Sequence, residues 1–238
     1  MPSMSNHTFA RHLVVVVAAA LAGACGFNSP TGETRHESVT FDLGDAKEAR
    51  VELRMGSGGL TVAGGTSKLL EGSFAYNVSS WKPAVDYSAA TGDIKIVQPG
   101  SSGSSFGNTV NEWNLKLNAD LPMAITANIG AGEATLDLGR LNLTKVEMNI
   151  GAGKVTMDLR GEPTRGYTVD IRGGVGETVV RLPKDVGISA AATKGIGDIS
   201  TEGLEQRDGV WVNPDRVGAP ITVRLDVKGG VGQIRLER

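Results

Sequence analysis

The stretch Ala127–Leu138, ANIGAGEATLDL, is followed 21 residues later by Met148–Leu159, MNIGAGKVTMDL. In each copy a Gly-Ala-Gly element stands between two runs of alternating apolar and polar residues, the pattern of a β-strand with one buried face. The apolar positions change parity across the glycines: Ile129 is odd and Leu136 is even. A straight strand would turn one of the two apolar runs outward. A bend at the glycines keeps both runs facing inward, and glycine accepts the positive φ that such a bend needs.

Gly-x-Gly elements recur through the carboxyl-terminal half of the chain. They are Gly130-Ala131-Gly132, Gly151-Ala152-Gly153, Gly174-Val175-Gly176, Gly195-Ile196-Gly197 and Gly230-Val231-Gly232. Successive second glycines are 21, 23, 21 and 35 residues apart, and the longest interval carries an insertion around Arg207–Trp211. A repeat of about 20 residues is the size of one rung in a β-solenoid, where each repeat packs on its neighbours. The sequence therefore predicts an all-β fold of stacked, single-strand, β-solenoid-like repeats with Gly-x-Gly corners; the alternative is a β-sandwich.

Residues at matching positions predict how the rungs stack. The last inward residue before four of the corners recurs every 21 residues: Ile129, Ile150, Ile171 and Ala192. We expect these side chains to lie on top of one another. The outward positions predict two further rows: Asp137, Asp158 and Arg181, and Asn128, Asn149 and Asp170. Because neighbouring strands lie about 4.8 Å apart, we expect Asp158 to pair with Arg181.

The amino-terminal half shows the same pattern with less regularity. Alternating apolar residues flank Gly56-Ser57-Gly58, again with a change of parity: Val51, Leu53, Met55, Leu60 and Val62. Residues 98–108, QPGSSGSSFGN, have the composition of a flexible loop. We therefore expect an amino-terminal lobe at 38–110 and a carboxyl-terminal repeat lobe at 111–238.

The first 24 residues have the pattern of an export signal. Residues 13–22, LVVVVAAALA, form an apolar run that is too short to span a bilayer, which takes about 20 residues in a helix, but suits a signal peptide. The lone cysteine, Cys25, follows Leu21-Ala22-Gly23-Ala24, a segment similar to a bacterial lipobox. That resemblance implies cleavage after residue 24 and lipidation of Cys25. Ala22-Gly23-Ala24 is also an A-x-A cleavage site, and cleavage there without lipidation would release a soluble protein.

We interpret residues 1–24 as a signal peptide and residues 25–37 as a lipid anchor with a flexible tether. Gly26 stands where lipoproteins retained at the inner membrane usually carry Asp. The lipobox resemblance thus implies an exported, membrane-anchored protein, located at the outer membrane or on the periplasmic face in a Gram-negative cell.

Composition excludes several classes of function. The 24 basic and 26 acidic residues give a net charge of −2 without a cationic run, so nucleic acid is not an expected partner. A single cysteine excludes an internal disulfide. The three histidines, His7, His12 and His36, precede the predicted folded region, which therefore lacks the usual base of a Ser-His-Asp site.

The glycine-rich elements do not match known ligand loops. No Gly-Lys-Ser/Thr sequence opens a helix, as a phosphate-binding loop requires. The calcium-binding β-roll needs an Asp that Gly173–Glu177 and Gly229–Gln233 do not supply. The carboxylate pairs Glu202/Glu205 and Asp42/Asp45 are close in sequence, but hydrolases place such pairs in a deep cleft. We expect no catalytic residues, no cofactor and no metal, so the chain is not predicted to be an enzyme.

Two segments resemble known envelope families. The residues Val51–Leu60, Leu70-Glu71-Gly72 and Lys82-Pro83 look like the N-terminal toast-rack domain. The segment from Trp113 to Pro122 with the two Gly-Ala-Gly elements after it resembles the C-terminal domain of LiaF-type antibiotic-response proteins. The resemblance implies a stacked β-solenoid-like fold and a cell-envelope setting, and implies no chemistry. LiaF-type proteins usually have transmembrane helices, whereas this chain has a lipobox.

These observations predict a non-catalytic cell-envelope lipoprotein that acts as a binding or scaffold module through its β surface. Its expected partners are a membrane, through the amino-terminal lipid, and an envelope protein or cell-wall component. Two alternatives remain at this stage: a component of envelope or antibiotic stress signalling, and an enzyme acting on cell-wall polymers.

Overall fold

A computed structural model describes residues 31–100 and 108–238. Its strands are β1 (Arg35–Phe41), β2 (Ala49–Thr66), β3 (Leu70–Tyr76), β4 (Ala84–Ser88), β5 (Asp93–Val97), β6 (Asn111–Asn118), β7 (Met123–Asp137), β8 (Leu143–Asp158), β9 (Tyr167–Arg181), β10 (Gly187–Glu202), β11 (Glu205–Arg207), β12 (Val210–Val212) and β13 (Thr222–Glu237). Two short 3₁₀ helices span Ser79–Trp81 and Pro214–Arg216.

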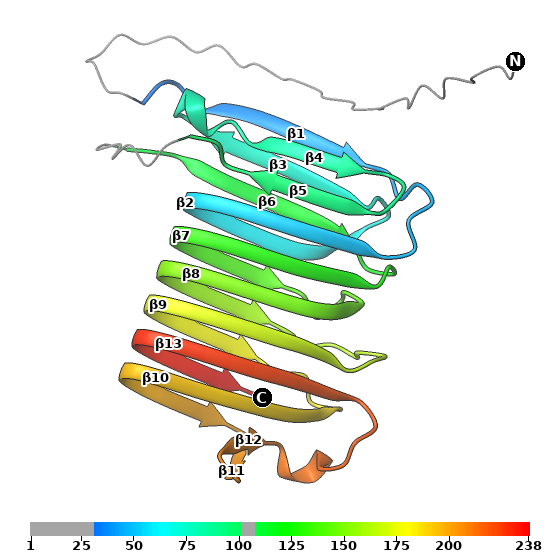
Figure 1. Cartoon of the computed structure of the whole chain (residues 1–238), viewed down its shortest axis with the longest axis vertical. Coiled ribbons are helices and arrows are strands. Elements are labelled where there is room, and N and C mark those ends of the chain that lie inside the picture. Colours follow the sequence, from blue (N-terminus) through cyan, green and yellow to red (C-terminus); the bar gives the residue numbers. More distant parts are fainter. Residues whose placement is uncertain (1–30, 101–107) are drawn as a thin grey trace, which may run out of the picture.

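Six long strands form a parallel stack in the order β2-β7-β8-β9-β13-β10. Each is one continuous strand that bends at its Gly-x-Gly element, so each rung gives one arm to each of two facing layers (Figure 1). The bends lie along one edge of the stack and the loops between rungs lie along the opposite edge. The prediction of stacked single-strand repeats with Gly-x-Gly corners is confirmed.

Both glycines of each bend are needed for close stacking. In β8, a Cβ on Gly153 would lie 1.8 Å from the carbonyl oxygen of Gly132, and φ at Gly153 is +139°. A Cβ on Gly151 would lie 2.5 Å from the carbonyl oxygen of Gly130. Both missing side chains would point along the stack into the backbone of the preceding rung. The middle residue, Ala152, is exposed at the tip of the bend.

The core lies between the two layers and is built from rows that run along the stack. One row contains side chains that are at most 1% exposed: Val62, Leu136, Met157, Val180 and Leu236. All five lie after the bend, and the residues before the bend face the same interior, as the parity change predicts. Full burial of such a side chain contributes about 1.5–3 kcal/mol, so the rows hold the rungs together.

The expected isoleucine row is correct for its first pair and wrong for its third member. Ile129 pairs with Ile150 across β7 and β8, but Ile171 of β9 lies opposite Met148. Ala192 shares the row of Ile171, through Val227 of β13. Between β8 and β9 the glycines of the two bends are aligned, and the two isoleucines are not. Because the resulting slip is two residues, it leaves every side chain on its own face.

The same slip corrects one polar row. Arg172, not Asp170, stands opposite Asn149. The other predicted row, Asp137, Asp158 and Arg181, is confirmed. It lies after the bend, and the two extra residues of the 23-residue interval precede the bend of β9, so they do not shift it. Arg181 lies opposite Asp158, and their closest N–O distance is 3.9 Å.

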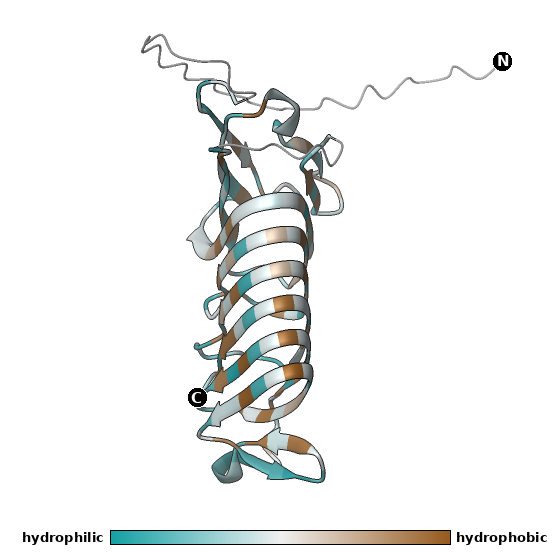
Figure 2. Cartoon of the chain, turned by 90° about the vertical axis from the view of Figure 1, so that its left-hand side faces the viewer, coloured by the Kyte–Doolittle hydropathy of each residue, from teal (hydrophilic) through white to brown (hydrophobic). Residues whose placement is uncertain are grey.

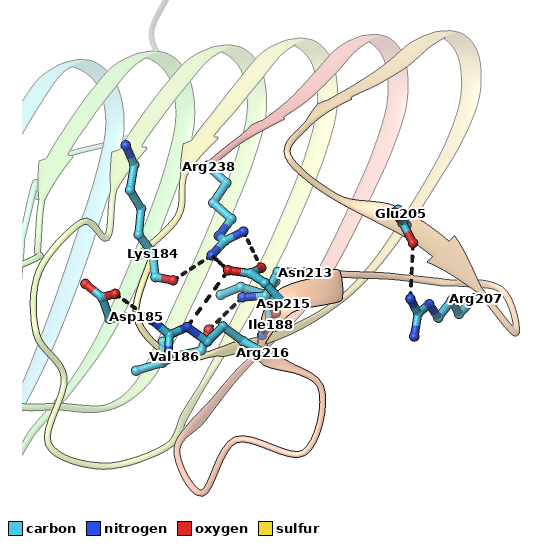
Figure 3. A network of polar contacts seen from close by, with 10 residues as sticks. All are labelled: Lys184, Asp185, Val186, Ile188, Glu205, Arg207, Asn213, Asp215, Arg216 and Arg238. Carbon is cyan, nitrogen blue, oxygen red and sulfur yellow. Dashed lines mark hydrogen bonds and ion pairs between the residues drawn. The ribbon is translucent and has the colours of Figure 1, made fainter.

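The last repeat in sequence is not the last rung in space. After β10 the chain forms the β11–β12 hairpin and returns as β13, which inserts between β9 and β10. Buried Asn213 secures this crossover: its Oδ1 accepts the backbone N–H of Ile188 and its Nδ2 donates to the carbonyl of Val186, both at 2.8 Å (Figure 3). Arg238 at the end of the chain donates to both carboxylate oxygens of Asp215 at 2.6 and 2.7 Å.

The opposite end of the stack is capped by shorter strands. The first arm of β2 pairs in parallel with β5, which pairs antiparallel with β4. The second arm of β2 pairs in parallel with β6, and β3 and β1 follow as antiparallel neighbours. Trp113 and Phe74 meet edge to face inside this cap, with ring centroids 5.6 Å apart. Strand β1 begins at Arg35, three residues before the expected boundary at 38. Residues 1–30, with the expected signal peptide and Cys25, lie outside the described residues, as do residues 101–107 of the expected loop.

Candidate functional site

The carboxylate pairs considered for hydrolysis lie on the surface beside cations. Glu205 accepts a hydrogen bond from Arg207 at 3.1 Å, and Asp42 accepts one from Lys68 at 2.5 Å. His36 is exposed on β1, while His7 and His12 are not among the described residues. In residues 31–100 and 108–238, no cluster of three or more His, Cys, Asp or Glu side chains could hold a metal ion.

A hydrogen-bonded cluster with shifted pKa values ties β1 to β3 and to the following helix. Tyr76 donates to Glu37 at 2.7 Å, and Lys82 donates to the same carboxylate oxygen at 2.8 Å. Burial and the hydrogen bond to Glu37 raise the pKa of Tyr76 to about 12. Burial also acts to raise the pKa of Glu37, but the hydrogen bonds from Lys82 and Tyr76 and the positive charges of Lys82 and Arg35 leave this pKa below its ordinary value. Glu37 therefore stays ionised at neutral pH and accepts both hydrogen bonds, as a structural link.

An open trough of about 720 Å³ runs along the bend edge across β2, β7, β8 and β9. We define the bend trough by its outer row, its inner row and its glycines: Arg54, Asn128, Asn149 and Arg172; Met55, Ile129 and Ile150; Gly56, Gly130, Gly151, Gly173 and Gly174. Val97 and Gln98 line its end at β2. The trough exists because stacked glycines put no side chains between the outer row and the bend tips.

The centre of the outer row is an amide ladder. Asn149 Nδ2 donates to Asn128 Oδ1 at 3.0 Å, one rung away. An amide side chain offers two N–H donors and two acceptor lone pairs, so this single bond uses only part of the capacity of the pair. At the β2 end, Gln98 Oε1 accepts the backbone N–H of Gly56 at 2.8 Å. The trough therefore carries fixed amide groups along its length.

Arginines stand at the two ends of the outer row. Arg54 is engaged by Glu52 on its own strand. Arg172 is exposed and makes no salt bridge with another residue in the described part of the chain. A guanidinium presents a planar set of donors that matches a carboxylate or a phosphate. Arg172 is thus an exposed guanidinium beside the amide ladder, and its positive charge also acts on Glu147.

The middle residues of the bends form a ridge along the trough, and they become more apolar toward the β10 end. They are Ser57, Ala131, Ala152, Val175, Val231 and Ile196, in stacking order. The last three are 56%, 45% and 72% exposed. Figure 2, which faces the bends, shows hydrophobic segments on them in the lower half of the stack.

The sequence predicted two members of the outer row, Asn128 and Asn149, but placed Asp170 where the structure has Arg172. The prediction took the isoleucines as reference positions, and these slip by two residues at β9. Counting back four residues from the second glycine of each bend identifies the correct row, since Asn149 precedes Gly153 by four and Arg172 precedes Gly176 by four. Glycine is the better reference because its position is set by backbone contact, as the distances at the bends demonstrate.

Stacked bent rungs, an open trough edged by amide and guanidinium groups, and an exposed apolar ridge define an all-β repeat protein whose rigid surface is suited to binding. The chain belongs to the toast-rack family: the model of the N-terminal domain of toast_rack, DUF2154, matches residues 30–181. This single match runs through both Gly-Ala-Gly elements. No helix in the described residues is long and apolar enough to cross a bilayer.

Comparison with solved structures found similar chains. A candidate cell adhesion protein from Clostridium sporogenes is 32% identical, with a TM-score of 0.83 over 86% of this chain and 99% of that chain. A candidate adhesin from Bacteroides fragilis is 13% identical, with a TM-score of 0.36 over 88% and 100% of the two chains. A candidate lipid-binding protein from Parabacteroides distasonis is 9% identical, with a TM-score of 0.26 over 85% and 97%. These last two are too distant to support an inference. Among curated proteins, none matches this chain.

Proposed function

We propose that this protein is a non-catalytic binding module of the cell envelope, and that its bend trough binds a cell-wall polymer. The observation that carries the proposal is the amide ladder beside the exposed guanidinium of Arg172, along an open trough. Amides exchange hydrogen bonds with hydroxyl groups, and a guanidinium binds carboxylate or phosphate. Cell-wall polymers carry both kinds of group.

The shape of the trough supports an extended ligand. It crosses four rungs, and neighbouring strands are about 4.8 Å apart, so equivalent groups are presented at regular steps along the stack. A trough that is open along its length admits a chain that continues beyond it at both ends, which a closed pocket would not. Rigid, repetitive stacks are well suited to such extended binding surfaces.

The relative from Clostridium sporogenes is described as a candidate cell adhesion protein, which supports a binding role in the envelope. We further propose that the signal peptide is cleaved after residue 24 and that lipid on Cys25 anchors the module to a membrane, through the expected tether. More than one acyl chain on Cys25 would make this anchoring stable.

Co-sedimentation of the purified protein with isolated cell-wall sacculi tests the trough. We expect Arg172→Glu to reduce the bound fraction several-fold, because reversing a contacting charge turns attraction into repulsion. Arg224→Glu is the matched control: Arg224 is exposed on β13, on the same outer layer but outside the trough. Equal retention of the two variants would refute binding at the trough.

Membrane fractionation of cells producing Cys25→Ala tests the anchor separately. We expect the variant to leave the membrane fraction, because it lacks the sulfur that carries the lipid. If it stays in the membrane fraction as the wild type does, lipid anchoring through Cys25 is wrong.

A further inference from the structure

The last rung of the stack leaves one of its arms uncovered. Strand β10 pairs with β13 along its whole length on one side. On its other side, β12 covers only Ser189 and Ala190. Beyond Ala190, the outer side of β10 has no strand neighbour in the described part of the chain, and the second arm forms the open end of the stack (Figure 1). Unpaired backbone groups on such an edge can bind another strand.

The interior of the stack is accessible at this edge. Ile199 and Thr201 of β10 are half-buried, whereas Ile234 and Leu236, at the same positions of β13, are 3% and 0% exposed. The bend tip of β10 adds Ile196, which is 72% exposed. A covering strand would therefore need apolar side chains at every second position.

Two outward side chains of this arm, Asp198 and Glu202, are acidic and form no salt bridge among the described residues, and Ser200 lies between them. Between inner rungs the same two rows form ion pairs across the stack: Lys154 with Glu177 at 3.0 Å, and Arg181 with Glu237 at 3.4 Å. Asp198 and Glu202 end these rows. Neither makes a salt bridge to another described residue. A strand added next would satisfy them with Lys or Arg at alternate positions.

This charge pattern distinguishes between the possible occupants. Two copies of β10 paired through their second arms would bring Asp198 and Glu202 close to the same acidic residues of the other copy, which is unfavourable. The amino-terminal part of the described chain enters at β1, at the far end of the stack (Figure 1). A basic, alternating strand of another protein fits both the apolar interior and the acidic rows.

We propose that the second arm of β10 is a docking edge for an extended segment of a partner protein in which apolar residues alternate with Lys or Arg. The segment adds one more rung, with its apolar side chains over Ile199 and Thr201 and its cations beside Asp198 and Glu202. This is strand addition, in which backbone hydrogen bonds supply affinity and alternate side chains supply specificity. The docking edge lies at β10, outside the bend trough, so it is independent of the polymer site.

A binding experiment with defined peptides tests the proposal. The probe is a fluorescently labelled, end-capped octapeptide of alternating valine and lysine, titrated with the purified protein and followed by anisotropy. We expect saturable binding, about tenfold weaker binding to the double variant Asp198→Lys/Glu202→Lys, and a gain of binding by that variant for the valine–glutamate octapeptide. The matched control is Glu133→Lys/Asp137→Lys, which changes the same two rows on β7, inside the stack; its binding should equal that of the wild type.

Hydrogen exchange separates strand addition from simple charge attraction. Bound peptide should slow exchange of those backbone amides in Lys194–Glu202 that point away from β13, because these amides gain partners, and should leave the amides of β7 unchanged. The proposal is overturned if the two double variants bind the basic peptide equally, if exchange at β10 does not change, or if the protein instead self-associates through this edge. Loss of the peptide interaction would leave sacculus binding at Arg172 unaffected, so the two proposals fail separately.

Discussion

Replacing one bend glycine with alanine should destabilise the whole stack. In Gly153→Ala, the new Cβ would lie 1.8 Å from the carbonyl oxygen of Gly132, well inside the 3.0 Å at which Cβ contacts essentially cease. One of the two atoms must move by at least about 1.2 Å to relieve this contact. The substitution also forces alanine to adopt a φ of +139°, a conformation that costs about 1–3 kcal/mol.

Together the strain and the displaced rung should lower the unfolding free energy by about 4 kcal/mol, near the upper end of single substitutions. For a chain of this length, 1 kcal/mol corresponds to about 2–4 °C in Tm, so we expect a fall of about 10 °C or more. Thermal unfolding followed by circular dichroism at 218 nm, roughly the β-sheet minimum, measures it, and urea unfolding checks the free energy.

Ala152→Val is the matched control one residue away. Ala152 is exposed at the tip of the bend, and Val175 occupies the same position in β9. We expect a change within about 0.5 kcal/mol, as for surface sites in general. If Gly153→Ala melted within about 2 °C of the wild type, or if Ala152→Val were equally harmful, the account of close glycine stacking would be refuted.

Two further substitutions test the crossover and the charged rows. Asn213→Ala leaves the N–H of Ile188 and the carbonyl of Val186 without their partner, so we expect a loss of about 2–4 kcal/mol in urea unfolding; a loss below about 0.5 kcal/mol would contradict it. For Asp158, burial acts to raise the pKa, but hydrogen bonds from Arg160 and nearby positive charge hold it below its ordinary value. Its stabilisation is therefore present above the unfolded pKa of about 3.9 and is lost as pH falls through the folded value. Asp158→Asn should accordingly be less stable than the wild type at pH 7, with a deficit that shrinks below about pH 4; a deficit constant with pH would show that the carboxylate charge does not contribute.

Much of the fold was predictable because its determinants are local. Alternation, the change of parity and the paired glycines of Gly130–Gly132 or Gly151–Gly153 each describe a few consecutive residues, and they specify a strand, a bend and the buried face. The buried row that contains Leu136 and Met157 follows from this pattern. Asn128 and Asn149 of the trough were also predictable as neighbours in one row, since each precedes the same Ile-Gly-Ala-Gly bend.

The order and register of the rungs were decided by the tertiary structure. All rungs present similar apolar rows to each other, so no local pattern distinguishes β13 from β10 as the neighbour of β9. A slip of two residues preserves alternation, and the sequence alone could not choose between aligning Ile150 with Ile171 and aligning the glycines. Backbone contact at the bends chose the glycines. That choice placed Arg172 beside the amide ladder, and the return of β13 into the stack left β10 as its open end, because only the assembled stack shows which rung lacks a neighbour.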